Sequence, residues 1–306
     1  MPESQQTSPA TIGFIGTGIM GQSMAGHLMA AGHPLHVFTR TRTKADSLVA
    51  RGATWQDSVA DVARSSEIVI TMLGLPQDVE EVYLGEDGLV ATARPGSLLI
   101  DMTTSSPLLS IQIARAAAAR GVTCLDAPVS GGDIGARQAT LVIMVGGSPD
   151  AFERAKPLFD RLGRSVTLLG DSGSGQRCKL ANQVAVAIGM VAWCEALAHA
   201  RCGGLDPVAV QGVISGGAAG SWALTNLAPR ALAGDFAPGF MVRHLVKDVR
   251  IALEAARAAG LDLPGLETAA RLYERLEQLG HGSEGTQALL SVYDRESGAT
   301  QPPRQR

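Results

Sequence analysis

The chain has 306 residues, of which 45% are hydrophobic and 18% charged, and its formal net charge is -3 at pH 7. This length and composition predict two globular domains, and the small negative charge gives no electrostatic reason to expect nucleic acid or an anionic membrane as a partner. The four cysteines show neither zinc spacing nor a disulfide framework, which favours a cytoplasmic protein.

Residues 1–10 and 296–306 are the two ends of the chain, and we expect both to be disordered. The amino-terminal end lacks the basic start and apolar core of a secretory signal. Neither end is therefore assigned to a domain.

The first element is a short apolar run from Thr11, which a glycine-rich turn joins to a helical pattern that ends at Gly32. The turn has G-x-G-x-x-G spacing: the first glycine permits a tight turn, the second admits a pyrophosphate, and the third lets helix and strand pack closely. Free amides at the start of the helix then hold the negative charge. The cofactor-binding residues predicted in this turn are Gly16, Thr17, Gly18, Ile19, Met20 and Gly21.

The second apolar run, PLHVFTR, is expected to carry the ribose-specifying position at its carboxyl end. An acidic residue there would accept hydrogen bonds from the ribose hydroxyls, but the chain offers Thr39, Arg40 and Thr41, followed by Arg42. Because arginine suits a 2'-phosphate, the sequence favours NADP over NAD. The alternative is that these arginines belong to an ordinary solvated loop.

Five further apolar runs are expected to be strands, with helical segments between them, at residues 67–73, 97–102, 122–128, 141–147 and 165–170. The alternation predicts an α/β Rossmann-type dinucleotide-binding domain over residues 11–170, with a mostly parallel, doubly wound sheet. Ligands bind beyond the carboxyl ends of the strands in such sheets. The residues that follow the strands are therefore candidates for a cleft.

One of these candidates is the turn Ser130-Gly131-Gly132. Consecutive glycine amides can form a concave anion nest, to which the serine hydroxyl adds a donor. The alternative is a plain tight turn. A dinucleotide motif in the same chain adds weight to the anion-binding interpretation.

A long buried helix is predicted from Gly173 to Gly204. Lys179, Asn182 and Gln183 lie at i, i+3 and i+4, so one face of this helix would present an ammonium and two amide groups together. The alternative is a core helix whose lysine reaches out to solvent. The apolar part, Val184 to Cys194, is about half of the ~20 residues that a bilayer span requires, and no membrane partner is expected.

After the long helix the pattern stays helical with glycine breaks, which predicts an all-α domain over residues 171–295, joined to the first domain by that helix. Its apolar faces exceed what one small domain can cover, so we expect a homodimer or homotetramer. No set among the six histidines has the spacing of metal ligands, and no metal is expected.

Four segments in this order resemble the β-hydroxyacid dehydrogenase family: FIGTGIMG, DAPVSGGDIGARQATLVIMVGG from Asp126, GSGQRCKLANQ, and KDVRIAL from Lys247. The family includes 3-hydroxyisobutyrate dehydrogenases, tartronate semialdehyde reductases, and glyoxylate and succinic semialdehyde reductases. The resemblance extends from Ile12 to about Asp294. It implies an NAD(P)-dependent oxidoreductase that interconverts a small β-hydroxy acid and its semialdehyde.

The resemblance also implies roles for individual residues. Lys179 would be the catalytic residue, the turn Ser130-Gly131-Gly132 would hold the carboxylate of the substrate, and Asn182 would help to position the substrate. The residues implied in cofactor binding are Met72, Leu73 and Thr104, together with Lys247 and Asp248, which would close over the nicotinamide end. The chain departs from many members in having Gln183 for asparagine and Thr39 for asparagine or aspartate.

The chemistry of Lys179 follows from the reaction itself. Hydride transfer to a carbonyl builds negative charge on its oxygen, and an ammonium can both stabilise this charge and donate a proton. Partial desolvation would lower the pKa of the lysine, whereas the carboxylate of the substrate would raise it. Two alternatives stay open, an imine reductase on a related scaffold and a non-catalytic cofactor-binding sensor, and the individual β-hydroxy acid is not distinguished.

Overall fold

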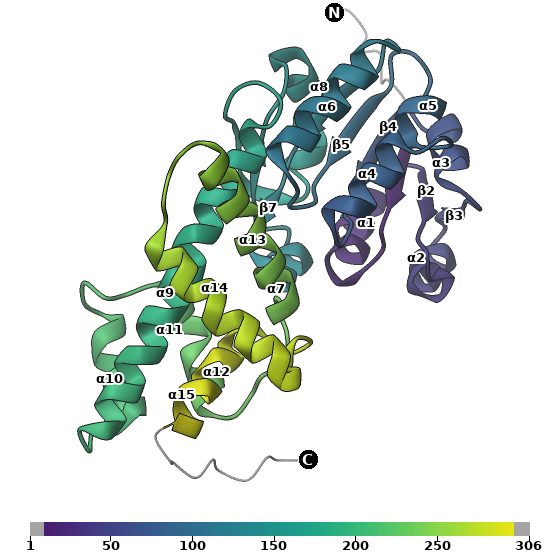
Figure 1. The fold of residues 1–306 in the computed structure, drawn as a ribbon. Coiled ribbons are helices and arrows are strands. Elements are labelled where there is room, and N and C mark those ends of the chain that lie inside the picture. The colour runs from purple at the N-terminus through teal and green to yellow at the C-terminus, as the bar shows by residue number, and fades with distance from the viewer. Residues whose placement is uncertain (1–8, 297–306) are drawn as a thin grey trace, which may run out of the picture. The chain divides into compact units, whose positions relative to one another are not determined.

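The computed structural model describes residues 9–296, so the ends predicted to be disordered lie almost wholly outside the described residues. The chain divides into two compact units, one that ends at Lys179 and one that begins at Leu180. The division falls inside the long helix, because Gln176 in its first turn and the preceding Gly173 are both hydrogen-bonded to Asp126 of the first unit. The two units are shown in Figure 1.

The first unit contains a sheet of six parallel strands in the order β3-β2-β1-β4-β5-β6. The order reverses between β1 and β4, and ligands bind at such a switch point in open α/β sheets. The predicted Rossmann-type fold is therefore confirmed. The strands are β1 (Ile12–Ile15), β2 (Leu35–Phe38), β3 (Thr54–Trp55), β4 (Ile68–Thr71), β5 (Leu98–Asp101) and β6 (Thr123–Asp126).

Helices cover both faces of this sheet, which explains why β1, β4 and β5 are buried at every position. Successive residues point to opposite faces: Ile68 and Ile70 pack in one core, and Val69 packs in another. Figure 1 shows α4 and α6 over β4 and β5. The helices are α1 (Ile19–Ala30), α2 (Asp46–Ala50) after the turn η1 (Arg42–Ala45), α3 (Val59–Ser65), α4 (Pro76–Leu84), α5 (Leu89–Thr92) and α6 (Pro107–Ala118).

A second, three-stranded sheet follows, in the order β7-β8-β9, where the sequence predicted two more strands of one sheet. The chain keeps the direction of β6 through Pro128 into β7, and β7 runs antiparallel to β8, with Val129 opposite Ile143 and Ser130 opposite Val142. An antiparallel bridge between Asp126 and Gly146 connects the two sheets. The elements are β7 (Val129–Ser130), α7 (Gly132–Gln138), β8 (Leu141–Val145), α8 (Pro149–Phe159) and β9 (Gly163–Leu168).

The second unit is helical in its described part, apart from one isolated bridge between Met241 and Gly285. Its core is formed by apolar side chains of α9, α13 and α14, including Met190, Val249 and Tyr273. The all-α prediction is confirmed. The elements are α9 (Ser174–Cys202), α10 (Pro207–Ser215), α11 (Trp222–Asn226), α12 (Ala228–Leu232), α13 (Val242–Ala258), α14 (Pro264–Leu276), η2 (Glu277–His281), η3 (Thr286–Leu289) and α15 (Leu290–Glu296).

By length and composition alone, α9 could cross a membrane. Core helices of water-soluble proteins meet the same criterion. The apolar side chains Ala187, Met190 and Leu197 of α9 are buried in the core of the second unit, which accounts for its composition without a lipid phase. The absence of a membrane partner stays a prediction.

Candidate functional site

The glycine-rich turn after β1 is closely packed on one side and open on the other. Gly16 has φ +95, and a Cβ atom there would collide with the carbonyl oxygen of Met72. A Cβ on Gly21 would collide with the carbonyl oxygen of Gly16, whereas a Cβ on Gly18 would meet no atom within 4 Å. The backbone at Gly18 is therefore accessible to a ligand.

Helix α1 begins at this open position with groups that suit an anion. Gly18 is its N-cap and supplies no side-chain hydrogen bond, and its first turn contains no acidic residue. The neighbouring Thr17 is buried, and its Oγ1 atom has no hydrogen-bond partner. Backbone N–H groups at a helix start bind phosphate, so these residues fit the pyrophosphate of a dinucleotide.

The two arginines after β2 have different partners. Arg40 lies between Thr39 and Thr41, is 79% exposed, and pairs with Asp78 at 2.8 Å between Nη1 and Oδ1. Arg42 lies over the ring of Trp55, at 5.1 Å from its centroid. Arg40 is thus an exposed guanidinium that already holds an anionic group, which is the chemistry that a 2'-phosphate would require.

The residues after β4 and β5 are bonded to each other, as expected for loops at one edge of a parallel sheet. The backbone N–H of Leu73, which follows Met72, donates to Thr103 Oγ1 at 2.8 Å. Thr103 is buried and Thr104, the next residue, is half-buried. Three of the predicted cofactor-binding residues, Met72, Leu73 and Thr104, are therefore brought to one place.

A buried polar network lies directly beneath these loops. Asp101 Oδ1 accepts two hydrogen bonds, one from Thr71 Oγ1 at 2.8 Å and one from the backbone N–H of Thr103 at 3.0 Å. Since the only proton of Thr71 is used in this way, the Tyr83 hydroxyl must be the donor in its 3.1 Å contact with Thr71. Burial raises the pKa of Asp101 to about 6, against the hydrogen bonds from Thr103 and Thr71.

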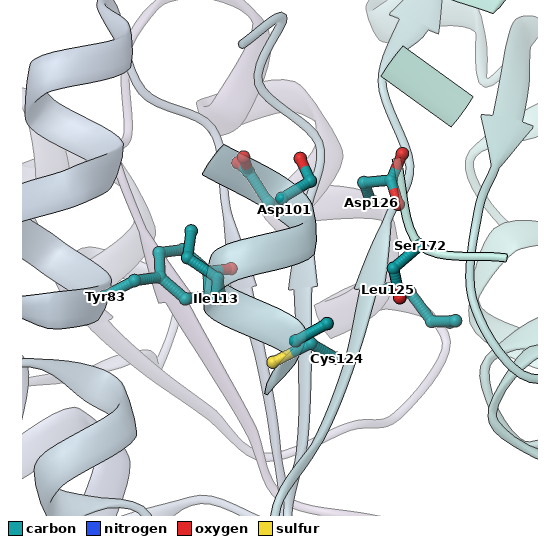
Figure 2. Close-up of a pocket in the computed structure, with 9 residues that line it drawn as sticks. Tyr83, Asp101, Ile113, Cys124, Leu125, Asp126 and Ser172 are labelled. Atoms are coloured by element: carbon teal, nitrogen blue, oxygen red, sulfur yellow. The ribbon is translucent and has the colours of Figure 1, made fainter. Parts of the chain in front are cut away.

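Asp126, at the end of β6, is a second buried carboxylate, and both its oxygens accept backbone N–H groups from the start of α9. The donors are Gly173, at 2.7 Å from Oδ1, and Gln176, at 2.9 Å from Oδ2. Burial raises the pKa of Asp126, and these hydrogen bonds oppose the shift. Figure 2 shows Asp101 and Asp126 beside a cavity of about 10 Å³, the size of one water molecule.

Cys124 lines the same cavity from the middle of β6. Burial, together with the charge of Asp101, raises the pKa of its thiol to about 12. A thiol with such a pKa is protonated at neutral pH and is a poor nucleophile. Cys124 is therefore a packing residue.

The turn Ser130-Gly131-Gly132 joins β7 to α7. Gly131 has φ +130 and Gly132 has φ +61, so two successive residues adopt backbone conformations that other residues rarely take. Gly131 is exposed and Ser130 is half-buried. The backbone of this turn is open to a ligand, as an anion nest requires.

Helix α9 carries the predicted catalytic lysine near its start. Lys179 is buried at 6% exposure. Its neighbours on the helix face at i+3 and i+4 are Asn182 and Gln183, and the Asn182 Nδ2 donates to Gln183 Oε1 at 2.8 Å. Helical spacing thus presents an ammonium and two amides in one row.

In the second unit, Gln183 links α9 to the Lys247-Asp248 step of α13. Its Nε2 donates to Asp248 Oδ2 at 2.6 Å, and Lys247 Nζ lies 3.0 Å from Asp248 Oδ1. Gln183 and Asp248 are both buried. The structure therefore brings Asn182, Lys247 and Asp248 into one bonded group, with Gln183 as the member that joins them.

His244 faces the same group from α13. Burial lowers the pKa of its imidazole, and the charge of Lys247 adds to this effect. The ring stacks on Phe240 with 6.2 Å between centroids. Among the described residues no group of three or more histidine, cysteine, aspartate or glutamate side chains could hold a metal ion.

Sequence reasoning assigned no role to Asp101, Asp126 or Gln176. Asp101 and Asp126 each end an apolar strand, in the segments LLID and TCLD, at the sheet edge where ligands bind. A carboxylate at the end of a buried strand is costly unless it is hydrogen-bonded. An aspartate at the end of each apolar run could therefore have pointed to a buried hydrogen-bond network. Gln176 gave no such signal, because its partners lie far away in the sequence.

Two family models together match most of the chain. One, described as the NAD binding domain of 6-phosphogluconate dehydrogenase, matches residues 11–170. The other, described as NAD-binding of NADP-dependent 3-hydroxyisobutyrate dehydrogenase, matches residues 173–293. The two matches meet close to the start of α9.

Full-length relatives are similar over the same range. An uncharacterized oxidoreductase of Bacillus subtilis is 50% identical over 283 residues, which cover 92% of this chain and 98% of the relative. The 2-hydroxy-3-oxopropionate reductase of Escherichia coli is 41% identical, with 92% and 97% covered. The solved 3-hydroxyisobutyrate dehydrogenase of Mycobacterium tuberculosis with L-serine has a TM-score of 0.85 at 32% identity, with 93% and 99% covered.

Proposed function

Since the chain belongs to the β-hydroxyacid dehydrogenase family, we propose that it interconverts a small β-hydroxy acid and its semialdehyde, with Lys179 as general acid and base. The family and the Rossmann-type fold make it an oxidoreductase with a nicotinamide dinucleotide cofactor. The observation that carries the proposal is the placement of Lys179: it is buried on α9, about one turn after Gln176, whose side chain is bonded to the loop that follows β5.

The proposed chemistry uses Lys179 as the proton donor and acceptor. The nicotinamide ring, when bound, supplies or accepts the hydride at the carbon of the reacting carbonyl or alcohol. In reduction the ammonium of Lys179 donates its proton to the carbonyl oxygen, which becomes the hydroxyl. In oxidation the neutral amine takes the hydroxyl proton back. The positive charge also stabilises the oxygen while negative charge develops on it.

The other end of the substrate is assigned to the turn Ser130-Gly131-Gly132. Its exposed backbone and two positive φ angles suit a carboxylate, and the serine hydroxyl adds a donor. Asn182 lies less than one turn beyond Lys179 and offers an amide to the same small molecule. Because a pocket separates substrates that differ by one methylene by only ~1 to 3 kcal/mol, the proposal covers the class of small β-hydroxy acids.

NADP is the proposed preference between the two cofactors. The support is Arg40, an exposed guanidinium at the carboxyl end of β2 that binds the carboxylate of Asp78. A 2'-phosphate would replace that carboxylate. We expect Arg40→Ala to raise the KM for NADP about 10-fold, which is the lower end for a hydrogen bond to a charged group, and to leave the KM for NAD unchanged. Equal effects on both cofactors would contradict the preference.

The decisive experiment is steady-state turnover of a panel of small β-hydroxy acids and their semialdehydes, with NAD(H) and NADP(H) measured separately. Lys179→Ala should lower kcat by ~100- to 10,000-fold, because it removes the proton donor. Lys156→Ala is the matched control, since Lys156 is a solvent-exposed lysine paired with Asp160 on α8. If wild type binds the cofactor and turns over no member of the panel, the proposed substrate class is wrong.

The two alternatives predict other results in this experiment. An imine reductase would reduce cyclic imines and spare the semialdehydes, and the lysine position of that group is usually occupied by another residue. A cofactor-binding sensor would bind the dinucleotide without turnover. The presence of both Lys179 and the Ser130-Gly131-Gly132 turn favours the β-hydroxy acid reaction over either alternative.

We also propose a homodimer or homotetramer through the helical unit. None of the nine residues of α10 is buried, and its neighbourhood exposes Val208, Val213 and Trp222 by 60% or more. An apolar helix left open in this way is typical of an interface between subunits. Light scattering tests the proposal: Val213→Glu should produce a smaller species, and a wild-type monomer would contradict it.

A further inference from the structure

We propose that Asp126 and Gln176 are positioning residues, which hold the first turn of α9, and with it Lys179, against the two loops that follow β4 and β5. The inference rests on the proposed function of Lys179 as the proton donor. Neither residue is assigned a contact with substrate or cofactor. Each acts through the helix that carries the lysine.

Asp126 fixes the start of α9 by capping it from another element. Its side chain, 4% exposed, spans the gap between the N-cap residue Gly173 and the third helical residue Gln176, with one carboxylate oxygen on each N–H. Two charge-assisted hydrogen bonds from one rigid strand end define both the position and the direction of the helix axis. The carboxylate also faces the positive end of the dipole of a 29-residue helix.

Gln176 provides the second attachment, through its side-chain amide. Its Oε1 accepts the backbone N–H of Ser105 at 2.9 Å, and its Nε2 donates to the backbone carbonyl of Thr103 at 2.7 Å. The side chain is fully buried, so neither bond is available to water. The amide accepts at one position and donates at the other, whereas an ionised carboxylate would face the Thr103 carbonyl without a proton.

The two attachments continue into the predicted cofactor loops. Thr103, which accepts from Gln176, receives the backbone N–H of Leu73 on its side-chain oxygen. One uninterrupted set of hydrogen bonds therefore connects Asp126, Gln176, Thr103 and Leu73. The lysine and both loops share the same buried scaffold.

Close packing leaves the first turn of α9 little freedom to shift. A Cβ on Gly175 would collide with the carbonyl oxygen of Met144, so the helix backbone lies directly on β8. Lys179 follows Gln176 by three residues, about 4.5 Å of helical rise. A displacement of about 1 Å at the reacting groups can lower a rate by ~100-fold, so a shift of this turn would lower the rate of the proposed reaction.

The test compares Gln176→Met with a matched control, Gln287→Met. Methionine keeps the length and the burial of glutamine and removes both hydrogen bonds. Gln287 is equally buried, and its amide donates to the backbone carbonyls of Asp235 and Ala237 in the second unit. Both variants should lose a similar amount of thermal stability. Only Gln176→Met should lower kcat, by ~10- to 100-fold, with the cofactor Kd and the substrate KM changed by less than about 3-fold.

A second measurement needs no substrate. The pKa of Lys179, followed by NMR of the 13C-dimethylated lysines and assigned with Lys179→Arg, should shift in Gln176→Met and stay unchanged in Gln287→Met, because a displaced ammonium changes its solvation and neighbours. Asp126→Asn, which can accept only one of the two N–H groups, should shift it in the same direction. An unchanged Lys179 pKa in both site variants would overturn the inference. Absence of turnover by wild type would instead contradict the proposed function alone.

Discussion

Asp101 and Asp126 end neighbouring parallel strands and face each other in the sheet register, but their carboxylates are stabilised in different ways. Both Asp126 oxygens accept backbone N–H groups of α9. Asp101 uses one oxygen for Thr71 and Thr103, and its Oδ2 has no hydrogen-bond partner. The same residue at equivalent strand ends is thus a helix cap in one case and a titratable buried acid in the other.

The two aspartates therefore have different roles: Asp126 holds the start of α9, and Asp101 is a buried acid with a raised pKa. The charge of Asp126 adds to burial in raising the pKa of Asp101, since two carboxylates beside one small cavity repel each other. Burial raises the pKa of Asp126 as well, but the backbone N–H groups of α9 that its two oxygens accept oppose this shift. Asp101 also has an oxygen, Oδ2, without a hydrogen-bond partner, and this oxygen can carry a proton. Both aspartates are drawn in Figure 2.

The largest effect is expected from removing the cap. Asp126→Ala leaves two buried N–H groups, those of Gly173 and Gln176, without an acceptor. At ~1 to 3 kcal/mol for each group, the free energy of unfolding should fall by roughly 2 to 6 kcal/mol, measured by urea denaturation. Asp262→Ala, at an exposed loop position, should change it by less than about 0.5 kcal/mol. Equal stabilities would show that Asp126 does not cap α9.

A smaller and pH-dependent effect is expected at Asp101. The pKa of its carboxyl is raised from 3.8 in the unfolded chain to about 6 in the folded protein, so the folded state binds the proton more tightly. Proton binding by Asp101 therefore adds about 3 kcal/mol to the free energy of unfolding below about pH 4. This contribution is lost as the pH rises through about 6.

Asp101→Asn tests this prediction, because it keeps an acceptor for Thr71 and Thr103 and cannot ionise. The difference in unfolding free energy between the variant and wild type, measured from pH 4 to pH 8 by urea denaturation, should move in favour of the variant as the pH rises. A difference that is independent of pH would place the pKa of Asp101 in its ordinary range.

Local patterns in the sequence predicted the fold and the backbone part of the site. The apolar strands alternate between two cores at neighbouring residues such as Val69 and Ile70, and the spacing of Gly16, Gly18 and Gly21 reflects short-range packing. The side-chain part was not predictable in this way. The amide of Gln176 and the carbonyl of Thr103 are 73 residues apart, and such a pair has no period or spacing that a sequence pattern can reveal.

The second sheet was predicted from the sequence only in part. The segments 141–147 and 165–170 were expected as strands, and they are, but β7 is only two residues long and has no recognisable alternation. It pairs antiparallel with β8, whereas neighbouring strands of the six-stranded sheet are all parallel. A short strand that changes the topology is therefore detected only in the folded structure.

The smallest expected effect refines the contrast between the two aspartates. Thr71→Val removes the hydroxyl that donates to Asp101 while nearly keeping the shape, so the pKa of Asp101 should rise further above 6 and stability near pH 8 should fall by about 1 kcal/mol. Tyr83→Phe is the matched control: it removes the donor to Thr71 and leaves the Thr71 bond to Asp101 in place. The pH at which stability is lost should therefore move upward in Thr71→Val and stay near the wild-type value in Tyr83→Phe. If both variants move it equally, the pKa of Asp101 depends on the whole chain of hydroxyls and not on its direct donor.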